Sequence, residues 1–361
     1  MDILIVSASS GRGLAKDADI LQSAITSMGH ACQVEHLPPT PEWQSRLSHY
    51  RYRLLSRYLP SSVGNLYYTT RAAIARTPPR QARADLVIHL ENIRLSYLNR
   101  GKSHWLIPNQ EWFIESRLPY LRFIDRIQCK TKHAVGIFSQ FHSKSTYLGF
   151  TGAAKSNAPD PAEKDLNLAI HIAGNSQFRG TGVVLDCWLQ HPEWPRIMVV
   201  SQHLNPADYS CSNIEIASNL TDQEIEALWQ KASFAILPSE VEGYGQVLAE
   251  ALANGCVTVT TDAPPMNELV EECRGYLAEP EKNQPFRLGT RFKVSKRSLE
   301  KVIDKALSES PEHLDRIAHN ATQWYDFNHQ AFLSRLTKAV NELAEQPLDQ
   351  SGTTPQEKPV R

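Results

Sequence analysis

Residues 237–262 read LPSEVEGYGQVLAEALANGCVTVTTD, and the interpretation of the whole chain starts from this stretch. The apolar run Phe234–Leu237 predicts a buried strand, which leads into a glycine-flanked loop over residues 242–245. An apolar-periodic helix is expected next, stopped by Gly255 and followed by a β-branched strand over Cys256–Thr261. Open α/β sheets bind ligands in loops at the carboxyl ends of their strands. The stretch therefore predicts an α/β domain with a ligand site in this loop.

Two glutamates, Glu242 and Glu250, lie on either side of the predicted start of the helix. The N-terminus of a helix offers free backbone N–H groups and a positive dipole end, which suit a phosphate. Carboxylates beside a bound phosphate are expected to face uncharged hydroxyl groups, such as those of a sugar and a ribose. For the bare pair, the alternative is two solvated charges, one in a loop and one on a helix.

In its full context, PSEVEGYGQVLAEALANGCVTVTTD resembles the donor-binding signature of the family 4 glycosyltransferases. These enzymes have the GT-B architecture, in which two Rossmann-like domains face each other. The resemblance implies that Glu242 approaches the transferred sugar and that Glu250 holds the ribose. The loop residues that it assigns to the donor site are Ser239, Gly243, Tyr244 and Gly245.

The composition is that of a globular protein large enough for two domains. The chain has 361 residues, of which 41% are hydrophobic, and no apolar run approaches the roughly 20 residues of a membrane span. The N-terminus has no basic leader, and the six cysteines are scattered without a CxxC pair, so we expect a cytoplasmic protein with reduced thiols. No DxD-type metal motif follows a strand, and we expect neither metal nor cofactor. The nucleoside-diphosphate sugar implied by the resemblance is a donor substrate.

The chain opens with a predicted βαβ unit made of the strand Ile3–Ser7, the helix Leu14–Met28 and the strand Gln33–His36. The glycine turn before the helix lacks the full GxGxxG spacing and is a weak nucleotide fingerprint. Relatives place an N-terminal glycine loop against the diphosphate, and Gly11 and Gly13 resemble it by position. A purely structural turn is the alternative.

Two predicted helices, Trp43–Tyr58 and Tyr67–Ala75, interleave arginine with aromatic and aliphatic residues, and basic residues outnumber acidic ones from Tyr50 to Lys132. Such helices could form a peripheral contact with an anionic membrane, at its inner face. They could also pack their aromatic rings inward and leave arginine in water, which is the simpler interpretation. No nucleic-acid-binding module accompanies the charge.

Two further predicted strands end in polar residues at the expected cleft. The second of them, His104–Ile107, is followed by Asn109 and Glu111. Relatives commonly carry a histidine at this strand end, beside the reacting sugar, and Asn109 takes that position here. The resemblance thus implies that Asn109 or Glu111 acts from the first domain. A general-base role for Glu111 would permit inversion at the sugar carbon.

Further along the chain we expect a strand at Ala134–Phe138, a short helix at Phe141–Tyr147 and a linker over residues 151–164. The second domain then presents the loop GNSQFRG, in which Arg179 matches the second basic position of the family pattern and Asn175 replaces the first. A guanidinium here would stabilise charge on a departing diphosphate. The alternative is a surface arginine in a turn.

Together these features predict a GT-B fold. We expect an N-terminal acceptor-binding domain over residues 1–150, a C-terminal donor-binding domain over residues 165–343 whose last helix returns to the first domain, and a flexible tail over residues 346–361. The predicted function is transfer of a sugar from a nucleoside-diphosphate sugar to an acceptor hydroxyl without a metal, and the family resemblance implies retention of configuration. The sequence does not identify the acceptor, and an anionic or lipid-linked glycan would suit the arginines of the N-terminal domain. A catalytically degenerate binding or scaffolding subunit and a sugar-nucleotide 2-epimerase are the alternatives.

Overall fold

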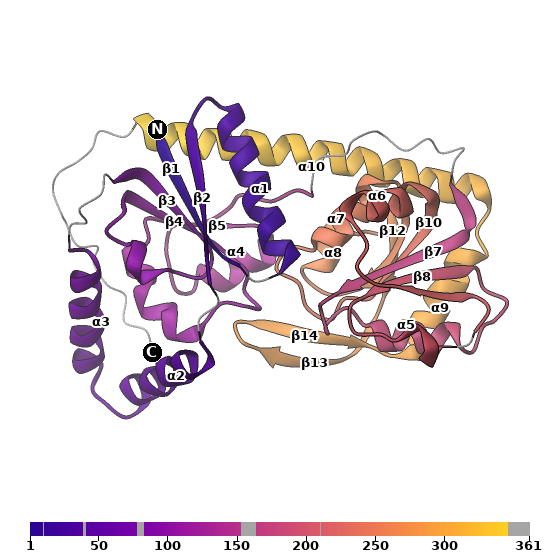
Figure 1. Ribbon diagram of the computed structural model, residues 1–361, viewed down its shortest axis with the longest axis horizontal. Coiled ribbons are helices and arrows are strands. Elements are labelled where there is room, and N and C mark those ends of the chain that lie inside the picture. The colour runs from indigo at the N-terminus through magenta and orange to yellow at the C-terminus, as the bar shows by residue number, and fades with distance from the viewer. Residues whose placement is uncertain (10, 39–40, 78–82, 153–163, 210, 346–361) are drawn as a thin grey trace.

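The computed structural model shows two α/β domains lying side by side, and it describes residues 1–9, 11–38, 41–77, 83–152, 164–209 and 211–345 (Figure 1). Most of the predicted linker (residues 153–163) and the predicted tail (346–361) lie outside the described residues.

The N-terminal domain is built on a parallel sheet of six strands in the order β2-β1-β3-β4-β5-β6. Its strands are β1 (Asp2–Ala8), β2 (Ala31–Leu37), β3 (Ala84–Glu91), β4 (Gly101–Pro108), β5 (Arg126–Cys129) and β6 (Ser145–Tyr147). Its helices are α1 (Arg12–Ser27), α2 (Glu42–Arg57), α3 (Ser61–Ala75) and α4 (Lys132–Phe138), with 3-10 turns at Leu95–Tyr97 and Glu115–Phe123. The near-continuous apolar runs of β1, β3 and β4 fit strands covered on both faces.

The C-terminal domain has a second parallel sheet of six strands in the order β12-β11-β10-β7-β8-β9. This is the doubly wound order of dinucleotide-binding folds. The strands are β7 (Asp165–Gly174), β8 (Arg196–Ser201), β9 (Ile214–Ala217), β10 (Ala232–Leu237), β11 (Val257–Thr261) and β12 (Gly275–Ala278), and an antiparallel hairpin adds β13 (Pro280–Phe286) and β14 (Gly289–Val294). The helices are α5 (Thr181–Trp188), α6 (Asp222–Lys231), α7 (Gln246–Ala253), α8 (Met266–Leu269), α9 (Lys296–Leu307) and α10 (Pro311–Glu345), with a 3-10 turn at Pro206–Asp208.

Helix α10, 35 residues long, runs along both domains (Figure 1). Near its start, the Asn320 side chain donates to the Cys273 carbonyl of the C-terminal domain at 2.7 Å. Near its end, Arg335 donates to the Leu148 carbonyl of the N-terminal domain at 2.6 Å. The prediction that the last helix returns to the first domain is confirmed, as is the GT-B fold class.

The two domains share part of their hydrophobic core where they meet. The rings of Phe150 and Phe332 lie 5.2 Å apart, and the ring of Tyr244 lies 5.6 Å from that of Phe150. The Tyr244 hydroxyl donates to the Phe150 carbonyl at 2.8 Å. These contacts join the loop over residues 242–245 to the end of the N-terminal domain.

Two predicted elements were wrong. Ala134–Phe138, predicted as a strand, belongs to helix α4, which begins where the Thr131 side chain accepts from the Ala134 N–H at 3.1 Å. The segment Phe141–Tyr147, predicted as a helix, contains strand β6 at its end. Apolar runs this short fit both the helical and the strand period, and the N-cap at Thr131 favours the helix over Lys132–Phe138.

Helix α4 is also capped from the other domain. The carboxylate of Glu268, in α8, accepts from the backbone N–H groups of Lys132 and His133 at 2.8 and 2.7 Å. A carboxylate at a helix N-terminus satisfies otherwise unpaired donors. Glu268 therefore has a structural contact between the domains.

Candidate active site

The candidate site lies where the strand order of each sheet changes direction. In the N-terminal domain this point is between β1 and β3, and in the C-terminal domain it is between β7 and β10. Loops that leave parallel strands on the two sides of such a point diverge and leave a crevice. The segments there carry the predicted glycine turn, the loop of Arg179 and the loop of Glu242.

Arg179 and Glu242 form an ion pair in the C-terminal domain. The guanidinium also donates to the Ser239 hydroxyl at 3.3 Å, and the Gln110 amide of the other domain donates to the Glu242 carbonyl at 2.8 Å. Burial lowers the pKa of Arg179 to about 10, so that the side chain stays charged at neutral pH. The predicted cation and the predicted sugar-binding carboxylate are thus adjacent.

Two helices begin at glycines beside this pair without a side-chain cap. Gly245 precedes α7 with φ = 105°, and Gly11 precedes α1 with φ = 83°. Both angles lie in the region that glycine adopts at low cost. The first N–H groups of α1 and α7 therefore have no side-chain partner from their own cap, as an anion site at a helix N-terminus requires.

Helices α1 and α7 are bonded to each other across the domains one turn in from their N-termini. The Lys16 ammonium of α1 pairs with the Glu250 carboxylate of α7 at 2.5 Å. The Arg12 guanidinium, in the predicted glycine turn, donates to the Leu220 carbonyl at 3.3 Å. Glu250, the predicted ribose ligand, is thus engaged by Lys16. Gly13, predicted in the turn, is the second residue of α1, and a β-carbon added to it would have open space around it.

Asn109 and Glu111 approach the donor loop from the N-terminal domain. A β-carbon added to Gly243 would lie 2.6 Å from Asn109 Oδ1 and 2.7 Å from Glu111 Oε1. Glu111 is 4% exposed, and its Oε2 has no hydrogen-bond partner among the residues that the structure describes. Burial raises the pKa of Glu111 to about 8, although the nearby Lys130 ammonium acts in the opposite direction. At neutral pH this carboxyl group is therefore largely protonated.

A buried ion pair that the sequence did not indicate supports this region. Lys130 and Asp17 pair with each other and are both almost fully buried. Lys130 also donates to Asn109 Oδ1 at 2.9 Å, and the Gln246 amide donates to Asp17 Oδ1 at 2.9 Å. The pair therefore connects Asn109 to the first residue of α7. No motif contains Asp17 or Lys130, and only the fold brings the two side chains together.

The Tyr244 side chain points away from the cleft. Its hydroxyl donates to the Phe150 carbonyl and accepts from the Asn328 amide at 3.2 Å. Only the backbone of Tyr244 is then available to a ligand at the loop, which is the contribution that the resemblance implies.

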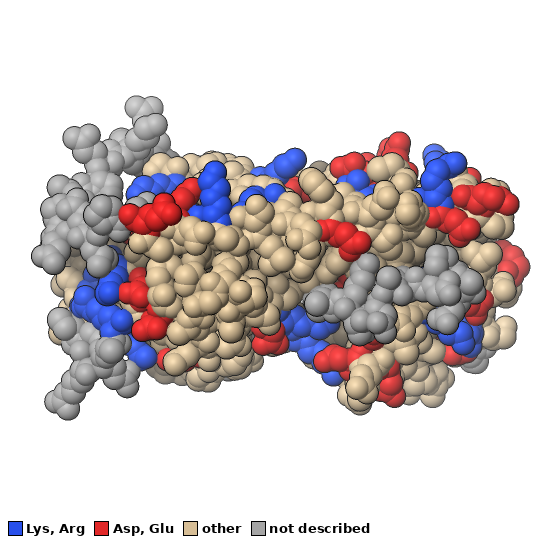
Figure 2. Space-filling view, turned by 90° about the horizontal axis from the view of Figure 1, so that it is seen from above, with Lys and Arg blue, Asp and Glu red and all other residues tan. Residues whose placement is uncertain are grey.

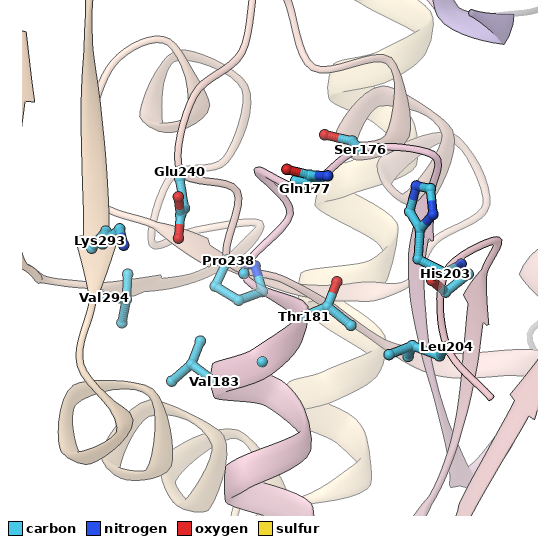
Figure 3. Close-up of a pocket in the computed structure, with 13 residues that line it drawn as sticks. Ser176, Gln177, Thr181, Val183, His203, Leu204, Pro238, Glu240, Lys293 and Val294 are labelled. Atoms are coloured by element: carbon cyan, nitrogen blue, oxygen red, sulfur yellow. Dashed lines mark hydrogen bonds between the residues drawn. The ribbon is translucent and has the colours of Figure 1, made fainter. Parts of the chain in front are cut away.

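A pocket of about 360 Å³ lies beside this cluster, at the N-terminus of α5 (Figure 3). Gln177, Thr181, His203 and Glu240 are among the residues that line it. It adjoins the loops of Arg179 and Glu242, but none of the residues predicted for the site lines it. Within the described residues, no group of three or more His, Cys, Asp or Glu side chains is arranged to hold a metal ion.

The comparisons with known proteins agree with this architecture. Residues 211–324 match the family model described as "Glycosyl transferases group 1". No curated protein sequence matches the chain at a significant level.

Several solved structures share the fold. Sucrose-phosphate synthase from Thermosynechococcus elongatus is 12% identical, with a TM-score of 0.67 over 95% of this chain and 99% of that one. The catalytic domain of starch synthase IV from Arabidopsis thaliana, bound to ADP and acarbose, is 8% identical, with a TM-score of 0.65 over 94% and 99%. HepE from Anabaena, in complex with UDP-glucose, is 14% identical, with a TM-score of 0.64 over 95% and 100%.

Two facing Rossmann-like domains with a returning C-terminal helix define the GT-B fold, which these solved structures share. The match to the group 1 glycosyltransferase model covers the part of the C-terminal domain that carries Glu242 and Glu250.

Proposed function

We propose that the protein transfers a sugar from a nucleoside-diphosphate sugar to an acceptor hydroxyl with retention of configuration. The observation that carries the proposal is the pairing of Arg179 with Glu242 at the uncapped start of α7. An anion at this helix N-terminus would gain backbone N–H donors and the Arg179 charge, while Glu242 would be freed to accept from sugar hydroxyls. The solved structures of HepE with UDP-glucose and of starch synthase IV with ADP support a nucleotide ligand of this kind.

In the proposed reaction, the bond between the sugar carbon and the diphosphate oxygen breaks, and its electron pair stays on the diphosphate. Arg179 and the first N–H groups of α7 stabilise this charge, without a metal. The acceptor oxygen bonds to the same carbon on the same face, and its proton passes to the leaving phosphate oxygen. Glu250 would hold the ribose after releasing Lys16.

Glu111 and Asn109 would contact the reacting sugar from the opposite domain. Because the pKa of Glu111 is about 8, its carboxyl group is largely protonated at neutral pH and can donate a hydrogen bond. A protonated carboxyl group cannot act as a general base, and this favours retention over inversion at neutral pH.

The experiment that tests this function measures release of nucleoside diphosphate from UDP-, GDP-, ADP- and dTDP-sugars by the purified protein with chelator present. Slow release from one donor is expected, and it would identify base and sugar. If a nucleotide raises the melting temperature but no nucleoside diphosphate is released, the donor site is present and turnover requires the acceptor. If no donor releases nucleoside diphosphate and no nucleotide stabilises the protein, the proposal is contradicted and a degenerate subunit is favoured.

We also propose that helices α2 and α3 place the enzyme on an anionic membrane surface, where a lipid-linked acceptor would be found. None of the helices in the described part of the chain is long and apolar enough to cross a membrane. However, Trp43, Tyr50 and Tyr58 are 65%, 69% and 74% exposed. The simpler expectation, that the aromatic rings pack inward, was wrong for these three rings, whereas Tyr68 of α3 is buried as that expectation had it.

Helix α2 exposes a largely apolar face, while its inner face combines the buried Leu55 with half-buried polar residues. The exposed residues Trp43, Leu47, Tyr50, Leu54 and Tyr58 follow each other at intervals of three or four and therefore share one face. On the inner face, Ser48 hydrogen-bonds Ser116 at 2.9 Å and Arg51 lies over the ring of Tyr67. Nine of the fourteen exposed large apolar side chains of the described residues lie between residues 43 and 74.

The charge of this region fits an anionic lipid surface. Residues 42–77 contain six arginines and a single acidic residue, Glu42, which pairs with Arg46. An apolar, aromatic face bordered by arginine is typical of interfacial helices. The face along α10 differs, because acidic and basic side chains are interspersed across it (Figure 2).

Co-sedimentation with vesicles tests this surface. We expect the protein to bind vesicles that contain phosphatidylglycerol and not vesicles of phosphatidylcholine alone. Trp43→Ser/Tyr50→Ser/Leu54→Ser should abolish binding, while Phe327→Ser, at a 75% exposed site on α10, should not. Equal binding by the triple variant would refute the proposal. The proposal would also be refuted if the wild type is a dimer and the triple variant a monomer, because the exposed face would then bind a second copy of the chain.

A further inference from the structure

The hairpin β13–β14 leaves the C-terminal domain between β12 and α9 and extends toward the N-terminal domain (Figure 1). Its strands pair in antiparallel register up to Phe286 and Gly289, so residues 286–289 form its tip. Sequence reasoning did not predict this element, because β13 is mostly polar and exposed.

The tip of the hairpin binds the segment of the N-terminal domain that carries Glu111. Arg287 donates to the Trp112 carbonyl at 2.9 Å, and its guanidinium carbon lies 5.1 Å from the centre of the Trp112 ring. The Phe286 ring lies edge-on to the same ring at 6.0 Å. Leu288 packs on the hydrophobic core of the N-terminal domain. Since Trp112 directly follows Glu111, the tip holds the backbone next to this carboxyl group.

The same hairpin contacts both donor-side loops. The ring of Phe286 lies 5.1 Å from that of Phe178, which directly precedes Arg179. Arg291 pairs with the carboxylate of Glu240, and the Phe292 N–H donates to the Glu240 carbonyl at 2.7 Å. Glu240 in turn donates its N–H to the Phe178 carbonyl at 2.8 Å. One element thus touches the three segments that carry Glu111, Arg179 and Glu242.

We propose that the hairpin tip is a strap that holds the two domains closed and positions Glu111 against the Glu242 loop. Domains joined by a linker move relative to each other unless their interface is large, and enzymes complete their sites by such closure. Arg287 and Leu288 are positioning residues that act through Trp112 and the adjacent core. The effect on turnover rests on the proposed transferase function, whereas the effect on closure does not.

The test uses a variant that removes only contacts with the N-terminal domain, Arg287→Ala/Leu288→Ser. Its matched control is Lys282→Ala/Asn283→Ala, at exposed positions of β13 in the same hairpin. We expect kcat to fall at least tenfold in the tip variant and to stay unchanged in the control. The Kd of the nucleoside diphosphate should change less than threefold in both, because the predicted donor contacts stay intact. Trp112→Phe, which keeps a ring for Arg287, should retain more activity than Trp112→Ala.

Hydrogen exchange of the full chain reports closure without a substrate. We expect the amides of residues 109–113 to exchange at least tenfold faster in the tip variant than in the wild type or the control. If these amides exchange in the tip variant at the wild-type rate, the strap is overturned. If the tip variant keeps the wild-type kcat, the positioning role is overturned. If the wild-type protein binds no nucleotide, the transferase proposal fails, while the exchange experiment still decides whether the tip closes the domains.

Discussion

Glu111 of the N-terminal domain meets the donor loop of the C-terminal domain at Gly243, where a β-carbon would lie 2.7 Å from Glu111 Oε1. Real β-carbons do not approach oxygen this closely, so any larger residue at this position would displace the side chains of Asn109 and Glu111. The glycine of the EGYG loop therefore has a steric role between domains in addition to the backbone contact that the resemblance implies.

Gly243→Ala should reduce kcat at least tenfold, because the new methyl group would push Asn109 and Glu111 away from the loop. Gly136→Ala is the matched control, since its β-carbon would have no neighbour within 4 Å and alanine favours the α4 helix. Steady-state kinetics of both variants check the prediction, and similar kcat values for the two would argue against it.

Stability should depend on pH through Glu111. Its pKa in the folded protein is about 8, above the ordinary value of 4.5, so the folded state holds the proton more tightly than the unfolded state. This contribution to stability is present below about pH 4.5 and is lost as the pH rises to about 8. Glu111→Gln cannot ionise, and its Tm relative to wild type should therefore increase across this window.

The magnitude of the Glu111→Gln effect should be on the order of a few kcal/mol at pH 8. Thermal unfolding at pH 5 and pH 8 measures it. A constant difference in Tm between wild type and variant at both pH values would show that the carboxyl group ionises normally.

The buried Asp17–Lys130 pair should behave as a unit. Removing one partner leaves an uncompensated buried charge, so Lys130→Met and Asp17→Asn should each cost about 3–5 kcal/mol in the free energy of unfolding. The double variant should cost clearly less than the sum of the two. Urea unfolding of the three variants gives the coupling energy, and additive losses would mean that the two side chains do not interact.

Much of the C-terminal domain could be predicted from the sequence, because local signals agreed there. The strand over Phe234–Leu237, the helix that follows and the stop at Gly255 all lie where expected. The loop of Arg179 and the loop of Glu242 come together because both follow strands at the same switch point.

The rest depends on contacts between segments far apart in the chain. Nothing local indicates that Lys130 is buried against Asp17, or that a polar hairpin reaches Trp112. The orientation of α2 was also beyond local reasoning, because arginine and tyrosine occur on both of its faces. The cap that Glu268 forms on α4 is likewise a contact that only the fold creates.

The most direct test of the central claim compares donor turnover by wild type, Glu242→Ala and Arg179→Ala, with nucleoside diphosphate release as the readout. The account predicts that one nucleoside-diphosphate sugar is turned over by the wild type, and that each substitution lowers kcat/KM by at least a hundredfold while the fold is kept. Full activity in both variants would contradict it, because neither side chain could then belong to the donor site.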